Sequence, residues 1–328
     1  MERLIGKRIL VTGGTGFVGS HVAEALLAKH ASVVVPYRSI DPRSYFATAS
    51  LAQRTILSVC DVTDARRIFD VVTKYEIEYI FHLAALATVT AAYHNPLESI
   101  VTNVVGTANV LEAARRFPGV KGVIVASSDK AYGKSHKPSV ETDRLAGDHP
   151  YEASKSSMDL LSSAYIKTYG TPVVITRFGN IYGPGDNNYS RIVPGIMQSM
   201  VTGMPLELRS DGTYMRDYVY VGDVARAYLF MLEHLEEFKG EAFNISTGVS
   251  LSVLQLIKKS EKILKKKINY RFMRTAKNEI PYQHLDCTKI TKLGWRPTYT
   301  LEKGLRLSYR WYTKHNRNCF GIHPSKPF

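Results

Sequence analysis

Apolar and polar positions alternate with two different periods along the first half of the chain. Short apolar runs of strand length, many of them rich in Val and Ile, are separated by stretches in which apolar positions recur at helical spacing. The runs at residues 8–14, 32–38, 54–64, 77–85 and 121–128 predict strands, and the segments 19–29, 65–75 and 96–116 predict helices. Strands that alternate with helices in this way predict a doubly wound parallel sheet with right-handed crossovers.

The alternation becomes less regular after residue 182. Residues 182–191, YGPGDNNYSR, form a stretch rich in Gly, Pro and Asn, which is typical of a loop that covers or lines a site. We therefore expect an α/β protein with a larger domain over residues 1–189 and a smaller α/β substrate lobe over most of residues 190–328. The apolar runs at 173–178 and 241–247 predict that the chain returns to the main sheet, the second time within residues 215–248.

Composition narrows the class of protein. The chain has 328 residues, of which 45% are hydrophobic and 22% charged, which suits a folded chain with one large or two smaller cores. No apolar run approaches the roughly 18 residues of a membrane helix, and residues 1–3 lead directly into a strand, so we expect a cytoplasmic protein with no membrane partner. Cys60, Cys287 and Cys319 are widely spaced without a C-x-x-C pair, which indicates reduced thiols and no metal site.

The net charge of +14 raises the question of a polyanionic partner. Part of this charge lies in residues 257–274, IKKSEKILKKKINYRFMR. The residues at near-helical spacing there predict a helix whose lysines lie on the solvated face; these residues are Leu256, Ile257, Ser260, Ile263 and Leu264. Because no recognised nucleic-acid motif accompanies the lysines, we expect no nucleic-acid partner. A basic protein also suits a small polyanionic substrate such as a nucleotide diphosphate.

A glycine-rich turn follows the first predicted strand. The segment VTGGTGFVGS places Gly13, Gly16 and Gly19 three residues apart, between that strand and the first helix. Glycines at these points permit a tight turn and let the backbone approach a pyrophosphate held at the helix N-terminus. The sequence therefore predicts a dinucleotide site that includes Phe17 and Val18, and a Rossmann-type domain over residues 1–189.

Three further strand ends are candidates for contacts with the cofactor. Arg38 follows the second strand, where a typical NAD site has an acidic residue; it could hold the 2′-phosphate of NADP or stack on adenine. We therefore expect NAD, with NADP as an open alternative. Asp61 and Val62 are expected at the adenine, and the residues expected at the ribose and pyrophosphate are Leu83, Ala84 and Ala85. His82, just before them, is expected to be a hydrogen-bonded structural histidine.

Four polar residues end the strand VIVASSDKAYG, which is otherwise built of Val, Ile and Ala. Ser127, Ser128, Asp129 and Lys130 follow one another there, and polar groups at the carboxyl end of a strand indicate a cleft. Farther along, Tyr151 and Lys155 are four residues apart and project from one face of a predicted helix. An ammonium close to the phenol would lower its pKa and make it an acid/base group near neutral pH.

Together these motifs resemble the extended short-chain dehydrogenase/reductases, the family of nucleotide-sugar epimerases and dehydratases. The glycine motif, SSDKAYG, the Tyr151/Lys155 pair, RFGNIYGPGD and RDYVYVGDVARA fall in that family's order and spacing. The resemblance implies a tightly held nicotinamide cofactor and a C-terminal sugar-nucleotide lobe. It also implies a catalytic triad, in which Tyr151 takes the proton of the sugar C4 hydroxyl, Ser128 hydrogen-bonds the same oxygen, and Lys155 anchors the nicotinamide ribose.

The residues after the triad serine separate the reactions within this family. Epimerases usually have small or neutral residues there, whereas the Asp-Lys sequence resembles the CDP-glucose 4,6-dehydratases. On this resemblance Asp129 protonates the departing C6 hydroxyl, and Lys130 takes or organises the C5 proton. The alternative is an exposed ion pair at a turn. We therefore predict a nucleotide-sugar 4,6-dehydratase, with a 4-epimerase as the alternative and a non-catalytic dinucleotide sensor as a weaker one.

Two further expectations concern substrate and assembly. Asn180 matches the family's substrate-binding Asn, and the guanidinium groups of Arg191 and Arg216 suit phosphate oxygens, so all three are candidates for the substrate pyrophosphate. The resemblance also implies a homodimer through a four-helix bundle made of the helices near residues 96–116 and 151–169. The second helix has an apolar stripe, which could face either the partner or the sheet; it consists of Met158, Leu161 and Tyr165.

Overall fold

The computed structural model describes residues 4–275 and 279–315 and is built around a seven-stranded parallel sheet. Its strands, in the order β10-β6-β5-β4-β1-β2-β3, are β1 (Arg8–Thr12), β2 (Ser32–Tyr37), β3 (Ile56–Val59), β4 (Tyr79–His82), β5 (Gly122–Ala126), β6 (Val173–Phe178) and β10 (Ala242–Ile245). The chain order reverses between β1 and β4, as in a doubly wound Rossmann-type sheet. The predicted fold class is confirmed, and the runs near 173 and 241 both enter this sheet.

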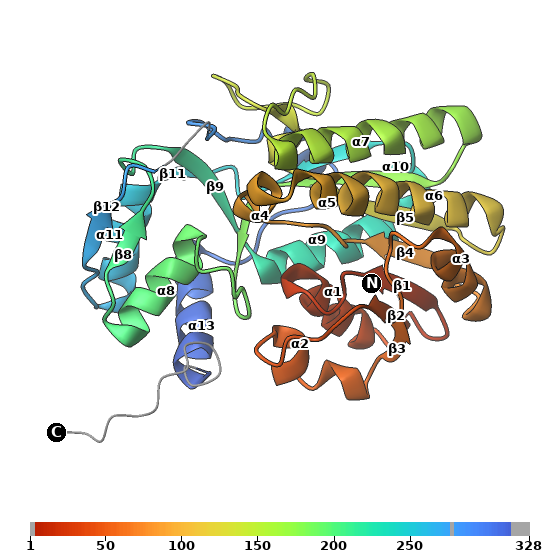
Figure 1. Ribbon diagram of the computed structural model, residues 1–328, viewed down its shortest axis with the longest axis horizontal. Helices are drawn as coiled ribbons and strands as arrows, with labels where there is room; N and C mark the ends of the chain where they lie inside the picture. The colour runs from red at the N-terminus through yellow and green to blue at the C-terminus, as the bar shows by residue number, and fades with distance from the viewer. Residues whose placement is uncertain (1–3, 276–278, 316–328) are drawn as a thin grey trace.

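Helices cover both faces of the sheet (Figure 1). One face packs against α1 (Phe17–Leu27), α9 (Val221–Glu233) and α10 (Leu235–Phe238), and the other against α3 (Ala65–Lys74), α6 (Gly106–Arg116) and α7 (Pro150–Tyr169). Apart from the edge strand β3, the strands contribute apolar residues to the cores on both faces; in β5, for example, Val123 and Val125 join one core and Ile124 joins the other. Burial on both faces explains why these strands read as continuous apolar runs rather than as alternating ones.

The predicted helix at 96–116 is continuous but not uniform. It consists of α5 (Pro96–Ile100), the π-helical turn η2 (Val101–Val105) and α6, and the short α4 (Val89–His94) precedes it. The Thr107 hydroxyl donates to the Asn103 carbonyl within this stretch, and the Asn103 side chain accepts from the Leu86 amide at 2.7 Å. A π turn thus presents Asn103 to the loop that follows β4, on the side of the sheet where ligands bind in such folds.

The C-terminal part of the chain adds a smaller lobe beside the carboxyl ends of the sheet strands (Figure 1). Its strands are β7 (Asn180–Tyr182), β8 (Leu206–Leu208), β9 (Met215–Tyr220), β11 (Ser250–Ser252) and β12 (Tyr270–Phe272), and its helices include α8 (Ile192–Thr202), α11 (Val253–Leu264) and α13 (Leu301–Lys314). Leu256, Ile257 and Ser260 of α11 are buried while Lys258 and Lys259 are exposed, as the sequence predicts. Short elements elsewhere are α2 (Tyr45–Thr48), η1 (Leu51–Gln53) and α12 (Thr288–Lys292).

Helix α7 has two apolar faces. Met158 is buried, and Leu161 and Tyr165 pack against the same core beneath the helix, so the predicted stripe faces the protein interior. The outward face instead carries Leu160, which is exposed, and the neighbouring α5 exposes Leu97 and Ile100. Among the described residues, no helix combines the length and apolarity needed to span a membrane.

Candidate active site

Glycines shape the turn between β1 and α1. Gly13 has φ of +70°, and a Cβ there would lie 2.8 Å from the backbone nitrogen of Ala84. A Cβ on Gly19 would lie 2.1 Å from the Gly13 carbonyl oxygen, so the helix can pack on the turn only because Gly19 has no side chain. Gly16 caps the helix in an extended conformation. These features fit a cradle for a pyrophosphate at the N-terminus of α1, where Phe17 and Val18 follow.

Just after the ends of β2 and β3, Arg38 pairs with Asp61. The Arg38 Nη1 lies 3.3 Å from the Asp61 Oδ2, and the other carboxylate oxygen accepts from the amide and the hydroxyl of Thr63, each at 2.9 Å. Burial acts to raise the pKa of Asp61, but the Thr63 hydrogen bonds and the Arg38 charge lower it overall. Val62 lies beside Asp61, and its carbonyl accepts from Asn109. The Arg38–Asp61 pair thus joins the segments that follow β2 and β3. Two adjacent strand ends held in this way suit the walls of an adenine pocket.

A buried hydrogen-bond chain holds the end of β4. Thr107 donates to a backbone carbonyl, so its oxygen can accept from the His82 Nε2, 2.9 Å away, while the His82 Nδ1 accepts from Thr12 at 2.8 Å. Thr12 in turn accepts from the Ala84 amide. Burial lowers the pKa of His82 to about 3, so the ring is neutral. His82 therefore orients the Leu83–Ala85 segment against the glycine turn, in agreement with a structural role.

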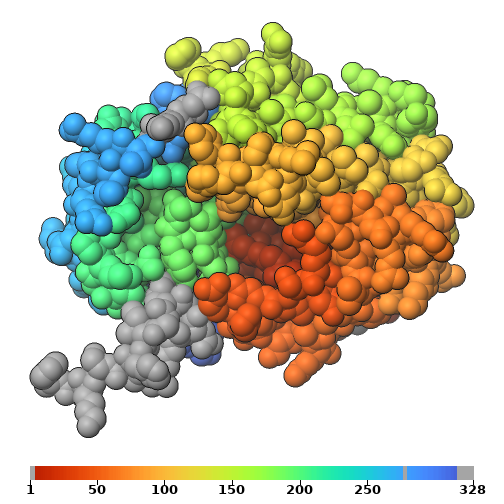
Figure 2. Space-filling model, in the orientation of Figure 1, coloured from red at the N-terminus to blue at the C-terminus, as the bar shows by residue number. Residues whose placement is uncertain are grey.

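One large cavity lies between the sheet domain and the lobe. It holds about 330 Å³, and Figure 2 shows the surface hollowed between the N-terminal segments in red, the α4–α5 stretch in gold and α8 in green. Eleven of the residues singled out from the sequence for the cofactor, catalysis or substrate line it: Val18, Leu83, Ala85, Ser127, Ser128, Lys130, Tyr151, Lys155, Asn180, Arg191 and Arg216. The predicted site residues outside the cavity lining lie at the β1–α1 turn and at the ends of β2, β3 and β4, apart from Asp129, which lies between Ser128 and Lys130 in the chain.

The three triad residues meet at the wall of this cavity. Burial raises the pKa of Tyr151 to about 12, and the Arg191 charge and a hydrogen bond with Ser128 only partly oppose it. The Lys155 ammonium donates to the Ala126 carbonyl at 2.7 Å. Burial lowers the pKa of Lys155 to about 8, while Asp159 acts to raise it. The expected lowering of the Tyr151 pKa by Lys155 is therefore not found, because the lysine points to the backbone of β5 and burial dominates.

Asp129 and Lys130 form an ion pair that is not exposed. They begin the single turn η3 (Asp129–Tyr132), and the Lys130 Nζ lies 3.2 Å from the Asp129 Oδ1 and 3.3 Å from the Asn180 Oδ1. The Ser128 hydroxyl also donates to the Asp129 Oδ1, at 2.9 Å. The Asp129 side chain is 3% exposed and that of Lys130 19%. The alternative of a solvated pair at a turn is therefore wrong for this chain.

The two arginines already have acidic neighbours. Arg191 binds Asp186 at 3.2 Å and donates to the Ala87 carbonyl, and its charge acts on Tyr151, so it borders the triad. Arg216 donates to the Met215 carbonyl, and its Nη2 lies 4.0 Å from the Glu279 Oε2. Both guanidinium groups line the cavity, where they suit an anionic group of a ligand.

Sequence reasoning missed several polar residues of the cavity. Tyr218 and Gln283 are buried there, and neither the phenol oxygen nor the two amide atoms have a hydrogen-bond partner among the described residues. Tyr218 could have been found, because it lies two residues after Arg216 on one strand and so shares its face. Gln283 and Glu279 come from an irregular C-terminal segment with no motif. Glu152, the neighbour of Tyr151, also lines the cavity, and burial raises its pKa to about 7.

Cysteines and metal ligands add nothing to this site. Cys60 and Cys287 are free thiols, and Cys319 lies outside the described residues. Within residues 4–275 and 279–315, no three His, Cys, Asp or Glu side chains gather in a way that could hold a metal ion.

Known proteins are similar to this chain in both sequence and fold. The model of the NAD dependent epimerase/dehydratase family matches residues 9–246. The dTDP-glucose 4,6-dehydratase of Salmonella typhimurium is 30% identical over 93% of this chain and 92% of its own length. The UDP-glucose 4-epimerase of Thermotoga maritima, solved with UDP-glucose, is 32% identical with a TM-score of 0.85 over 94% of this chain and 99% of its own.

A dTDP-glucose 4,6-dehydratase from Streptomyces venezuelae, solved with NAD bound, is 30% identical with a TM-score of 0.86, over 94% of this chain and 98% of its own. Both kinds of enzyme thus match nearly the whole chain, and the glycine cradle agrees with NAD as the cofactor. The suggestion of a non-catalytic sensor finds no support among these relatives. The chain is an enzyme of the NAD dependent epimerase/dehydratase family.

Proposed function

We propose that the chain is a nucleotide-sugar 4,6-dehydratase, which converts an NDP-hexose into an NDP-4-keto-6-deoxy-hexose and water. The observation that carries this proposal is the Asp129–Lys130 pair beside Ser128, in which the carboxylate is buried and the ammonium is largely shielded from solvent. Burying an ion costs several kcal/mol, which the attraction within a pair repays only in part. A 4-epimerase moves no proton at C5 or C6 and has no use for such a pair, whereas a dehydratase needs an acid and a base there.

The residues that would hold NAD are those of the glycine cradle together with Arg38, Asp61 and Lys155. Bound NAD would supply reversible hydride exchange, from C4 at the start and to C6 at the end, and a positive charge that lowers the pKa of Tyr151. Asp61 favours NAD over NADP, because its carboxylate lies next to Arg38 and would repel a 2′-phosphate there.

The side chains of the site account for the proton movements. Tyr151 takes the proton of the C4 hydroxyl while Ser128 hydrogen-bonds that oxygen. Transfer of one proton across the 3.2 Å contact from Lys130 to Asp129 converts the ion pair into an amine and a carboxylic acid. The amine then removes the C5 proton, which is acidic beside the C4 ketone, and Asp129 protonates the C6 hydroxyl, which leaves as water.

The remaining steps return the hydride and the protons. The hydride from C4 ends on C6, and Lys130 returns its proton to C5. The proton left on Tyr151 replaces the one that Asp129 lost. The net reaction is the loss of one water, with no net oxidation or reduction.

A 4-epimerase is the second candidate, because epimerases match this chain as well as dehydratases do. An epimerase would use Ser128, Tyr151 and Lys155 in the same way and would leave Asp129 and Lys130 as bystanders.

Product identity distinguishes the two candidates. The purified protein would be incubated with CDP-, UDP- and dTDP-glucose, and the products identified by mass and NMR, with Tyr151→Phe as the blank. CDP-glucose is included because the Asp-Lys sequence resembles that of its dehydratases. Loss of one water supports the proposal, and an isomer of unchanged mass identifies an epimerase.

We further propose that the chain forms a homodimer through α5 and α7. Leu97 and Leu160 are 69% and 58% exposed, Ile100 is also exposed, and the two helices that carry them, α5 and α7, are in contact. Exposed apolar side chains that gather on neighbouring helices mark a surface that a second copy would bury.

A further inference from the structure

We infer that Tyr132 is a positioning residue for the Asp129–Lys130 pair and that a buried network centred on Arg177 holds Tyr132 in place. This inference rests on the proposed dehydration, since only that reaction uses both members of the pair. Tyr132 is not among the residues that line the cavity, so its effect would pass through the turn that it ends.

The turn η3 is too short to fix its own position. It has four residues, and its backbone hydrogen bonds run from Ala131 to the Ser128 carbonyl and from Gly133 to the Lys130 carbonyl. A single 3₁₀ turn has little intrinsic stability, so contacts outside the turn must set where it lies. Two such contacts fall on the Ala131 carbonyl, which accepts from the Ser156 hydroxyl of α7 at 2.8 Å and from the Ala146 amide at 3.0 Å.

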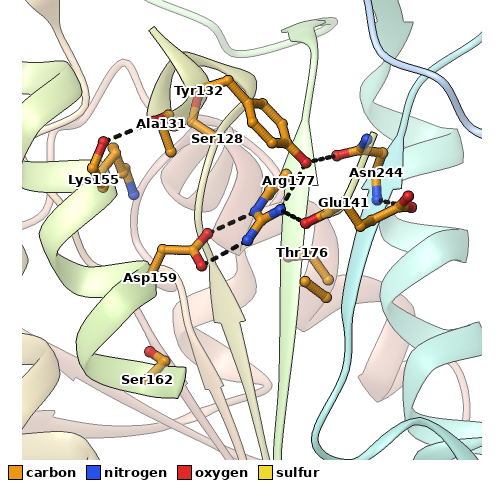
Figure 3. A network of polar contacts seen from close by, with 12 residues as sticks. Ser128, Ala131, Tyr132, Glu141, Lys155, Asp159, Ser162, Thr176, Arg177 and Asn244 are labelled. Carbon is orange, nitrogen blue, oxygen red and sulfur yellow. Dashed lines mark hydrogen bonds and ion pairs between the residues drawn. The ribbon is translucent and has the colours of Figure 1, made fainter. Parts of the chain in front are cut away.

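A further anchor is the Tyr132 hydroxyl, three residues after Asp129, and it is the one that reaches the central sheet (Figure 3). It accepts from the Arg177 Nη1 at 2.7 Å and donates to the Asn244 Oδ1 at 2.7 Å. The ring is 4% exposed. Both partners come from the central sheet, Arg177 from β6 and Asn244 from β10. The turn that starts with the ion pair is thus tied at its other end to two strands.

All three guanidinium nitrogens of Arg177 donate hydrogen bonds. Its Nε and Nη2 bind the two oxygens of Asp159 on α7 at 2.8 and 2.9 Å, and its Nη1 also donates to the Glu141 carbonyl at 2.8 Å. Asp159 is fully buried and lies one turn after Lys155. Because Asp159 binds one edge of the guanidinium group and the Glu141 carbonyl binds another, the group is held in one orientation. This orientation in turn fixes the position of the Tyr132 hydroxyl.

Asn244 connects the network to the loops beside the lobe. Its side-chain nitrogen, Nδ2, donates to the backbone carbonyls of Ser139 and Asp286 at 2.8 and 3.2 Å. Since this nitrogen is committed to two carbonyls, its oxygen is left to face Tyr132, which fixes the side chain's orientation. The phenol therefore has both a fixed donor and a fixed acceptor.

The Asp129 carboxylate depends on this placement. Its Oδ1 accepts hydrogen bonds from the Ser128 hydroxyl and the Lys130 ammonium, and its buried Oδ2 has no hydrogen-bond partner among the described residues. Among the described residues, no backbone amide donates to this carboxylate, so a shift of the turn would move it directly. A displacement of about 1 Å in a catalytic group can cost on the order of 10²-fold in rate.

The test is Tyr132→Phe, which keeps the ring and removes only the oxygen. Its matched control is Tyr45→Phe, which removes the hydroxyl that donates to Glu24 at 2.9 Å on α1, away from η3. We expect Tyr132→Phe to lower kcat about 10- to 100-fold with KM within about twofold. The isotope effect on kcat with substrate deuterated at C5 should rise, because C5 deprotonation becomes slower than the other steps. Tyr45→Phe should change neither quantity.

Three outcomes bear on the inference. Wild-type kcat in Tyr132→Phe overturns it, and so does a loss of kcat with no rise in the C5 isotope effect, because that indicates general loosening of the fold. Should Tyr132→Phe not fold, Arg177→Lys takes its place, since it keeps a charge for Asp159 but loses the fork that reaches Tyr132. Failure of the proposed function is seen separately, as a wild-type product that has not lost water.

Discussion

Asp129→Asn tests the acid role with the least change in shape. The side chain keeps an oxygen that can accept from Ser128, but it cannot give a proton to a leaving hydroxyl. Removal of a positioned acid lowers rates by about 10²–10⁴-fold. This corresponds to roughly 3–5 kcal/mol of activation free energy, at about 1.4 kcal/mol per factor of ten.

The structure indicates how much stability each variant should lose. Asp129→Asn leaves Lys130 with Asn180 and some solvent, so the fold should change little. Lys130→Met leaves the buried Asp129 carboxylate without its hydrogen-bonded cation, and breaking a buried pair in this way costs up to about 3–5 kcal/mol of folding stability. The double variant removes both charges and should regain most of that loss, while its kcat should be no lower than that of the worse single variant.

The assay follows product and cofactor together. In Asp129→Asn and in Lys130→Met the C4 oxidation remains available, so reduced nicotinamide should accumulate, as seen by its absorbance, while the dehydrated product forms slowly. Glu236→Gln is the control, because it breaks an exposed ion pair between Glu236 of α10 and Lys239, which follows that helix. Product formation at the wild-type rate in both single variants would refute the acid and base roles.

Four further predictions concern the rest of the site and the assembly. Tyr151→Phe should abolish turnover while NAD binding and the thermal midpoint stay near wild type; measurable turnover contradicts the triad. Gly13→Ala should weaken NAD binding in a fluorescence titration and destabilise the chain by more than Gly203→Ala, which has a similar positive φ but open space around it; equal effects argue against the cradle. The pKa of Lys155 is lowered to about 8, so NAD affinity should fall as pH rises through about 8 and the ammonium is lost, and an affinity that stays flat from about pH 7 to 9.5 contradicts this. Leu160→Glu should convert a dimer into monomers in light scattering, and a monomeric wild type removes the proposed interface.

Local signals predicted much of the fold. The strands and helices of the sheet domain followed from the periods of apolar positions, because each is a nearly continuous buried run or an amphipathic stretch. The glycine turn was also visible, since Gly13 and Gly19 are required by contacts made within a few residues or with the adjacent strand end.

Contacts between distant segments could not be predicted in the same way. Arg177 lies 45 residues after Tyr132 and Asn244 lies 112 residues after it, and no local pattern in the sequence indicates that the three side chains meet. The direction of the α7 stripe depended on which face of the helix the sheet covers, and the pKa of Tyr151 depended on its burial. Such properties arise from packing, which a short stretch of sequence does not record.

The most direct measurement uses NDP-glucose carrying deuterium at C4, with the nucleotide that the protein accepts. The product would be examined by mass spectrometry and by deuterium NMR. If the chain is a 4,6-dehydratase, the label moves from C4 to the new C6 methyl group and the product has lost one water. A product of unchanged mass with the label still at C4 and the C4 configuration inverted would contradict the proposed function.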